Sequence, residues 1–152
     1  MEIRAGGLDH PDVVALLEEH FAEMLAASPP GTCHFLDLTK LAADTVHFFT
    51  AWDGETLLGC GAFQALSDDH GEIKSMRTTK AALRRGVAAA LLSHIEREAR
   101  AHGIRQLSLE TGTGAPFEAA HGLYRRFGYG YCPPFGDYEA TDFNVFMTRT
   151  LD

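Results

Sequence analysis

The 152-residue sequence is poor in basic charge and in cysteine, and it lacks any long apolar run. Lys and Arg number 13 against 21 Asp and Glu, a formal net charge of −8, so a nucleic-acid partner is not expected. No stretch approaches the roughly 18–20 apolar residues that span a bilayer, and the first residues lack the apolar run of a signal peptide. We therefore expect a cytoplasmic protein with no membrane partner.

The three cysteines, Cys33, Cys60 and Cys132, are odd in number and widely spaced, and none belongs to a CxxC pair. This usage predicts reduced, unreactive thiols rather than a disulfide framework. The eight histidines show no HExxH or HxH spacing, and no paired cysteines accompany them. We expect no metal ion in this protein.

Composition and hydrophobic periodicity indicate one ordinary domain over residues 1–152, because apolar residues make up 45% and no linker or repeat interrupts the chain. Antiparallel strands come first and alternate with helices afterwards, which predicts a mixed, mostly antiparallel α/β sheet flanked by helices. The expected elements are a strand near Ile3, a helix from Pro11 to about Pro29, a short helix over 37–43, a hairpin over 46–66 turning at Asp53-Gly54, a strand over 71–79, a helix from Gly86 to Gly103, a strand over 107–110, a helix over 116–127 and a strand over 143–150. The helix after Gly86 is expected to turn Glu96, Arg97, Glu98 and Arg100 toward solvent.

Five basic residues and no acidic ones lie between positions 74 and 85, directly before this helix: Lys74, Arg77, Lys80, Arg84 and Arg85. The helix then starts with small residues, Gly86-Val87-Ala88-Ala89-Ala90. Because a helix N-terminus presents unpaired N–H groups and partial positive charge, this combination predicts a cradle for an anion such as a phosphate. The alternative is a solvated basic turn followed by good helix formers.

Three segments together are similar to the GCN5-related N-acetyltransferase (GNAT) superfamily, and closest to its bacterial small-molecule branch. They are Glu72-Ile73-Lys74-Ser75-Met76-Arg77, Arg84 to Leu92, and Leu123-Tyr124-Arg125-Arg126-Phe127-Gly128-Tyr129. The resemblance implies a GNAT-type fold that takes acetyl-CoA as acyl donor, without a metal. The implied acetyl-CoA contacts are Met76, Arg77, Thr78, Arg84, Arg85, Gly86, Val87, Ala88 and Ala89. Two residues depart from the family pattern. Leu83 stands where the family usually has Gln or Arg, and Phe117 stands where it often has Asn.

Within the resemblance, Glu72 and Tyr124 are the expected catalytic residues. Glu72 has the spacing of the family's basic glutamate and would deprotonate the acceptor amine; the alternative is an ion pair with Lys74 or Arg77. Tyr124 occupies the position of the family's leaving-group acid; the alternative is an aromatic ring that only packs its helix on the sheet. A backbone N–H around Met76 to Thr78 would polarise the thioester carbonyl.

The acceptor is expected to be a small-molecule amine that reacts directly in a ternary complex, with His34, Lys74, Glu110 and Asn144 as candidate contacts. Asp137 and Tyr138 are further candidates, within a segment that would cover the mouth of the site. If Lys74 or Arg77 faced the pocket, an amino-acid-like acceptor would be favoured through its carboxylate. The alternative function is a non-catalytic acyl-CoA sensor of the same fold. The final strand could pair across a homodimer, as the resemblance suggests.

Overall fold

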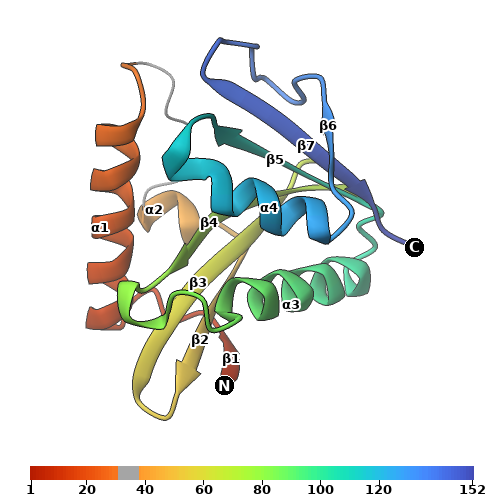
Figure 1. The fold of residues 1–152 in the computed structure, drawn as a ribbon. Coiled ribbons are helices and arrows are strands. Elements are labelled where there is room, and N and C mark those ends of the chain that lie inside the picture. Colours follow the sequence, from red (N-terminus) through yellow and green to blue (C-terminus); the bar gives the residue numbers. More distant parts are fainter. Residues whose placement is uncertain (31–37) are drawn as a thin grey trace.

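The computed structural model describes residues 1–30 and 38–152, which form one seven-stranded sheet with helices on both faces (Figure 1). The strand order is β1-β2-β3-β4-β5-β7-β6, and the β4–β5 pair alone is parallel among the described strands. The strands are β1 (Glu2–Ala5), β2 (Val46–Asp53), β3 (Thr56–Ala65), β4 (His70–Thr78), β5 (Gln106–Gly112), β6 (Gly130–Cys132) and β7 (Asn144–Thr150). The helices are α1 (Pro11–Ala27), α2 (Leu38–Leu41), α3 (Val87–Ala101) and α4 (Glu118–Arg126), with short 3₁₀ helices η1 (Lys80–Ala82) and η2 (Ala115–Phe117).

This architecture confirms the predicted mixed, mostly antiparallel α/β sheet flanked by helices. The expected elements are present, with differences at their ends. The last predicted helix begins as the 3₁₀ helix η2 before α4, and β6 was not expected. With only three residues, β6 carries too short a pattern to predict a strand, and its pairing with β7 defines it.

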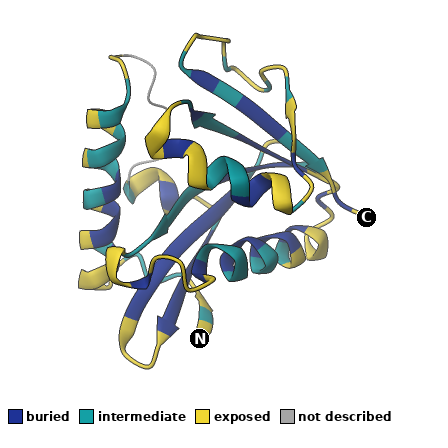
Figure 2. Ribbon diagram, in the orientation of Figure 1, coloured by how far each residue is buried: buried dark blue, intermediate teal, exposed yellow. Residues whose placement is uncertain are grey.

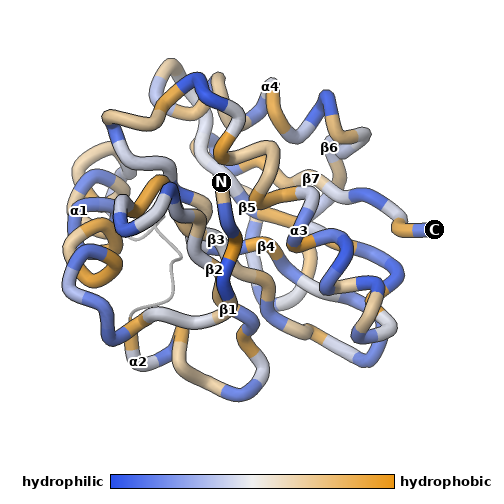
Figure 3. Tube along the Cα trace, turned by 90° about the horizontal axis from the view of Figure 1, so that it is seen from below, coloured by the Kyte–Doolittle hydropathy of each residue, from blue (hydrophilic) through white to orange (hydrophobic). Residues whose placement is uncertain are grey.

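The two faces of the sheet carry separate apolar cores. Helices α3 and α4 lie on one face, and α1 and α2 lie on the other, as the view from below shows (Figure 3). Leu91 and Ile95 of α3 pack with Phe63 on the first face, whereas Val13 and Leu17 of α1 belong to the second core. Figure 2 shows the buried residues following the central strands and the inner sides of α1 and α3.

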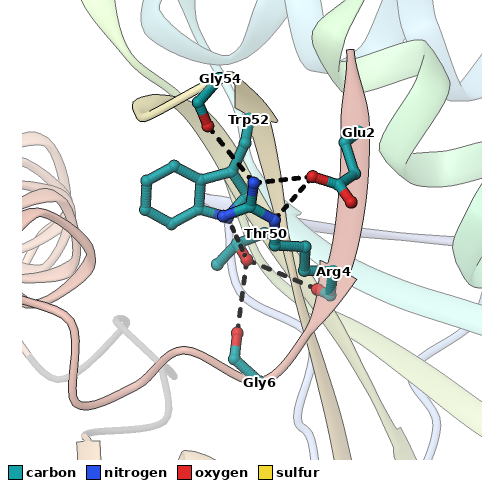
Figure 4. A network of polar contacts seen from close by, with 6 residues as sticks. All are labelled: Glu2, Arg4, Gly6, Thr50, Trp52 and Gly54. Atoms are coloured by element: carbon teal, nitrogen blue, oxygen red, sulfur yellow. Dashed lines mark hydrogen bonds and ion pairs between the residues drawn. The ribbon is translucent and has the colours of Figure 1, made fainter.

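Strand β1 is fixed to the edge of the sheet by a small polar network (Figure 4). The Arg4 guanidinium lies 5.0 Å from the ring centroid of Trp52 and donates from Nε to Glu2 over 2.8 Å. Beneath it, the Trp52 indole N–H donates to Thr50 Oγ1 over 2.8 Å. Because Trp52 is buried and is the single tryptophan of the sequence, its fluorescence is a direct reporter of unfolding.

The prediction that Glu96 faces solvent is wrong. Glu96 is buried, and only 4% of its surface is exposed. Its carboxylate accepts a hydrogen bond from the Tyr129 hydroxyl at 2.8 Å and two from Arg149 Nη1 at 2.8 and 2.7 Å. A buried carboxylate needs such partners, and Arg149 supplies them from β7, 53 residues later. Glu96 therefore joins α3 to β7 and to the end of α4.

Within the described ranges, no helix combines the length and the apolar character needed to cross a membrane.

Candidate active site

Strands β4 and β5 run apart after a short parallel contact, and this divergence opens the candidate site (Figure 1). Their pairing ends at Glu72 and Ser108. A bulge in β4 follows, where Ser75 has a φ of 58° and the register against β3 shifts between Cys60 and Ala62. The freed ends of both strands line a cavity of about 710 Å³.

Most of the predicted site residues line this one cavity. They are Glu72, Lys74, Met76, Arg77, Thr78, Arg84, Gly86, Val87, Ala88, Ala89, Glu110, Tyr124 and Asn144. Arg85 is exposed and is not among the lining residues. His34 lies outside the described residues.

The loop into α3 contains two residues in the left-handed backbone conformation. Arg84 has a φ of 64° and Gly86 a φ of 80°, so both adopt the left-handed conformation immediately before the helix. Alternation into this conformation turns successive N–H groups toward one point, and α3 adds its own unpaired N–H groups there. The Gly86 position is open, because nothing lies within 4 Å of where a Cβ would stand. The geometry supports the predicted phosphate cradle through backbone groups and Arg84.

Glu72 and Lys74 alternate along β4 and therefore point to the same face of the sheet, the face covered by α1. Lys74 Nζ lies 3.1 Å from Glu72 Oε2, and the two side chains are only 9% and 6% exposed. Tyr138 lies in the segment before β7. Its hydroxyl donates a hydrogen bond to the same oxygen of Glu72 and accepts a hydrogen bond from Lys74 at 2.7 Å. Burial, followed by the charge of Glu72, raises the pKa of Tyr138, so this hydroxyl stays protonated. Glu72 thus has the ion pair of the alternative interpretation and also lines the cavity.

Arg77 lies in contact with α1. Its Nη2 donates to Glu19 at 3.0 Å and also to Glu23, and Lys80 lies 3.5 and 3.3 Å from the same two carboxylates. The hydrogen bond from Arg77 lowers the pKa of Glu23. These ion pairs hold α1 against β4, and they occupy the guanidinium that was expected to contact acetyl-CoA or a substrate carboxylate.

Tyr124 lies on the inner face of α4, where it is buried and also lines the cavity. Its ring packs edge-to-face against Tyr129, with centroids 5.6 Å apart. Burial raises the pKa of Tyr124, which keeps its hydroxyl protonated. The structure therefore combines the packing of the alternative interpretation with the cavity position that a proton donor requires.

Asn144 and Glu110 meet where β7 begins beside the end of β5. Asn144 Nδ2 donates to Glu110 Oε2 at 2.6 Å. Among the described residues, the other amide atom, Asn144 Oδ1, is buried without a hydrogen-bond partner, and so are His20 Nδ1, Ser75 Oγ and Arg77 Nε. All four residues line the cavity.

Comparison of the sequence with known protein families shows to which class of protein this cavity belongs. The model of the acetyltransferase (GNAT) family matches residues 12–129. YsnE of Bacillus subtilis (strain 168), described as an uncharacterized N-acetyltransferase, is 48% identical over 151 residues, which cover 99% of this chain and 100% of YsnE.

This chain belongs to the GNAT acetyltransferase family.

Solved structures agree with the fold of this N-acetyltransferase. A protein of Klebsiella pneumoniae classed as an acyl-CoA N-acyltransferase superposes with a TM-score of 0.84 at 26% identity, covering 99% of this chain and 97% of that one. An aminoglycoside 6′-N-acetyltransferase complexed with coenzyme A superposes with a TM-score of 0.76 at 13% identity, covering 100% and 98%. The second likeness is one of fold alone.

Sequence reasoning missed the contribution of α1 to the GNAT cavity, which comes from His20, Glu23 and Met24. His20 follows Leu17 by three residues and so lies on the buried stripe of the helix, where a histidine is unusual enough to have been a signal. Tyr138 was expected only as one of several residues near the acceptor. Cys60 is buried, and burial raises the pKa of its thiol to about 12, in keeping with an unreactive cysteine; Cys33 lies outside the described residues. No cluster of three metal-ligating side chains occurs among the residues that the structure describes.

Proposed function

We propose that this N-acetyltransferase moves an acetyl group from acetyl-CoA directly to a small-molecule amine in a ternary complex. One observation carries the proposal: residues 86–89, at the start of α3, line the same cavity as Glu72 and Tyr124. The cradle would hold the pyrophosphate of the donor, with Arg84 beside it. The diverging strands leave room for the pantetheine arm to lie between them.

The bulge in β4 would place the thioester. Beyond Glu72, none of the described strands pairs with β4 on its β5 side, so the backbone around Met76 to Thr78 would be available to an extended ligand. An N–H group there would hydrogen-bond the thioester carbonyl and stabilise the negative charge that develops on its oxygen. The small side chains of Ala88 and Ala89 line the same cavity and leave the helix start accessible.

Glu72 and Tyr124 would move the two protons of the reaction. An alkyl ammonium has a pKa near ~10, so the acceptor must lose a proton before its nitrogen attacks, and Glu72 would accept it. The amide C–N bond forms as the thioester C–S bond breaks, and the nitrogen's second proton replaces the one that the departing sulfur takes up. Tyr124 would hydrogen-bond the departing sulfur and help protonate it, a role for which its raised pKa keeps the proton in place.

The test is a thiol-release assay with acetyl-CoA and a panel of amines, combined with calorimetry of coenzyme A binding. Glu72→Gln and Tyr124→Phe should each lower kcat by about 10²-fold or more, since positioned proton transfer contributes that much. The exposed residues Glu55 and Tyr131 supply matched controls, Glu55→Gln and Tyr131→Phe, which should retain full activity.

Three outcomes separate the alternatives. Full activity of both catalytic variants would refute their roles and leave the reaction class intact. Tight acetyl-CoA binding without transfer to any amine would indicate the acyl-CoA sensor. Failure of the purified protein to bind coenzyme A would refute the cradle and the proposed donor together.

A further inference from the structure

Four side chains of the cavity carry a buried polar atom that has no hydrogen-bond partner among the described residues: His20 Nδ1, Ser75 Oγ, Arg77 Nε and Asn144 Oδ1. Two of these atoms, Asn144 Oδ1 and His20 Nδ1, belong to side chains that are buried as a whole, since Asn144 is 7% exposed and His20 is 8% exposed. Most buried polar groups in proteins are hydrogen-bonded, because leaving one unpaired is costly. Unpartnered atoms on two different elements of one cavity indicate a polar ligand that completes them.

Asn144, the single asparagine of the sequence, indicates which hydrogen-bonding group the ligand brings. Its Nδ2 donates to the Glu110 carboxylate at 2.6 Å, and this contact fixes which amide atom is the oxygen. Oδ1 can only accept a hydrogen bond. The ligand must therefore bring an N–H or O–H donor to this point, beside a carboxylate.

His20 is compatible with a cationic donor. Burial, followed by the nearby Arg77, lowers the pKa of His20 to about 4, so its imidazole is neutral at pH 7 and does not repel a positive charge. In the tautomer protonated on Nε2, the unpartnered Nδ1 accepts a hydrogen bond.

The cations that would hold a carboxylate-bearing acceptor are already engaged. Lys74 contacts the Glu72 carboxylate and the Tyr138 hydroxyl, at 3.1 and 2.7 Å. Arg77 is held by Glu19 and Glu23 of α1. Arg77 Nε is buried without a hydrogen-bond partner among the described residues, but a substrate carboxylate that paired with the Nη2 end of this guanidinium would have to displace Glu19 and Glu23. A second amine meets two acceptors that lack a donor, Asn144 Oδ1 and His20 Nδ1.

We propose that the acceptor is a diamine-like molecule: one amine takes the acetyl group, and the second, protonated amine binds Asn144 Oδ1 beside Glu110. This inference rests on the proposed acetyl transfer, and it makes Asn144 a specificity-determining residue. The second amine does not react. Its N–H donors satisfy the buried amide oxygen, and its charge is balanced by the neighbouring carboxylate.

Three acceptors of equal chain length test the class: 1,4-diaminobutane, butylamine and 4-aminobutanoate, each with saturating acetyl-CoA. The diamine should exceed butylamine in kcat/KM by about tenfold or more, the value of one hydrogen bond to a charged group. 4-Aminobutanoate should be the poorest of the three. Equal rates for all three, or preference for 4-aminobutanoate, would overturn the proposal and leave acetyl transfer standing.

Asn144→Ala should abolish the advantage of the diamine by raising its KM about tenfold, with little change for butylamine. Gln106→Ala is the matched control, because it removes an exposed carboxamide at the far end of β5 and should preserve the preference. Trp52 fluorescence checks that each variant is folded, and Asn144→Ser provides a second, smaller change.

Calorimetry of 1,4-diaminobutane with the coenzyme A-saturated protein tests the subsite without turnover. Binding that weakens about tenfold in Asn144→Ala supports the subsite even if no amine is acetylated, an outcome that would refute the transfer reaction alone. Diamine binding that is absent, or equal in the two proteins, overturns the inference.

Discussion

Glu72 shows how one residue of the site is held in place. Both of its described contacts, from Lys74 and from Tyr138, reach the same oxygen, Oε2. Two donors on one oxygen fix the plane of the carboxylate, and they come from different parts of the chain, β4 itself and the segment before β7. Tyr138 is therefore a positioning residue for the proposed base.

Tyr138→Phe should lower kcat about tenfold, because a hydrogen bond to a charged group is worth roughly 1.5–3 kcal/mol and its loss frees the carboxylate to rotate. The KM for acetyl-CoA should stay unchanged, since Tyr138 is not among the residues lining the cavity at the cradle. Steady-state kinetics at saturating donor measures both values. Tyr131→Phe, at an exposed tyrosine of β6, is the control, and an unaltered kcat in Tyr138→Phe would refute the positioning role.

At the scale of residues, the sequence predicts contacts within one element and misses contacts across elements. The pair of Glu72 and Lys74 could be anticipated, because residues two apart on a strand share a face. The contact with Tyr138 joins residues 66 positions apart, and no local pattern reports it. Glu96 was placed wrongly for the same reason, because its burial depends on Arg149 of β7.

Among the elements, the start of α3 carries the proposed donor site, and its shape depends on Gly86. Gly86→Ala should weaken coenzyme A binding about tenfold, since a φ of 80° costs an alanine roughly 1–2 kcal/mol and the loop would relax away from the cradle. Calorimetry with coenzyme A measures the change.

Gly54→Ala is the control for backbone strain. Gly54 has a φ of 59° in the β2–β3 hairpin, and, as at Gly86, nothing lies within 4 Å of its Cβ position. The Gly54→Ala variant should lose about as much stability as the Gly86→Ala variant, with no change in its affinity for coenzyme A. Equal affinity losses in both variants would show that strain alone, and not the cradle, was measured.

The contact between Glu96 of α3 and Arg149 of β7 stabilises the arrangement of these two elements. Arg149→Met should lower the free energy of unfolding by about 2–3 kcal/mol, because it leaves the buried Glu96 carboxylate without its guanidinium; the 29% exposure of Arg149 keeps the loss at the lower end. Urea titration followed by Trp52 fluorescence measures this loss. A double variant, Glu96→Leu with Arg149→Met, should recover stability, and a single variant as stable as the parent would contradict the argument.

The elements themselves were largely predictable, and the opening between them was not. Periodicities of two and of about 3.6 residues located the strands and the longer helices, including the small-residue start of α3. The divergence of β4 from β5 begins after Glu72, and the bulge that follows has a positive φ at Ser75, which no residue type in Lys74-Ser75-Met76 requires. The helix start was therefore anticipated from sequence, whereas the cavity that connects it to Glu72 and Asn144 needed the structure.

In the whole molecule, the cavity is built from both faces of the sheet, so its integrity depends on how the layers are held together. Helix α4 brings Tyr124 from one face, and α1 brings His20 and Glu23 from the other. The ion pairs of Arg77 and Lys80 with Glu19 and Glu23 hold α1 to β4. Conditions that loosen α1 should therefore affect folding and the acceptor site together.

Mild acid is such a condition, because folding keeps His20 neutral. Its pKa falls from 6.5 to about 4, mainly through burial, so between these values the unfolded chain binds more protons and stability is lost as the pH falls. His47 and His94, whose pKa values are also lowered by burial, act in the same direction. From pH 7 to pH 5, His20 alone should cost about 2 kcal/mol. Urea titrations of the parent and of the His20→Gln variant at pH 7 and at pH 5 measure this loss of stability.

The variant should lose about 2 kcal/mol less than the parent over this interval, because glutamine does not titrate. Glu23 does not confuse the comparison: its pKa is lowered below 4.5 by the hydrogen bond from Arg77, so its contribution disappears only at lower pH. An equal loss in both proteins would mean that the imidazole of His20 is protonated within the fold. The same titration therefore also tests whether His20 adds a positive charge to the cavity that would receive the diamine.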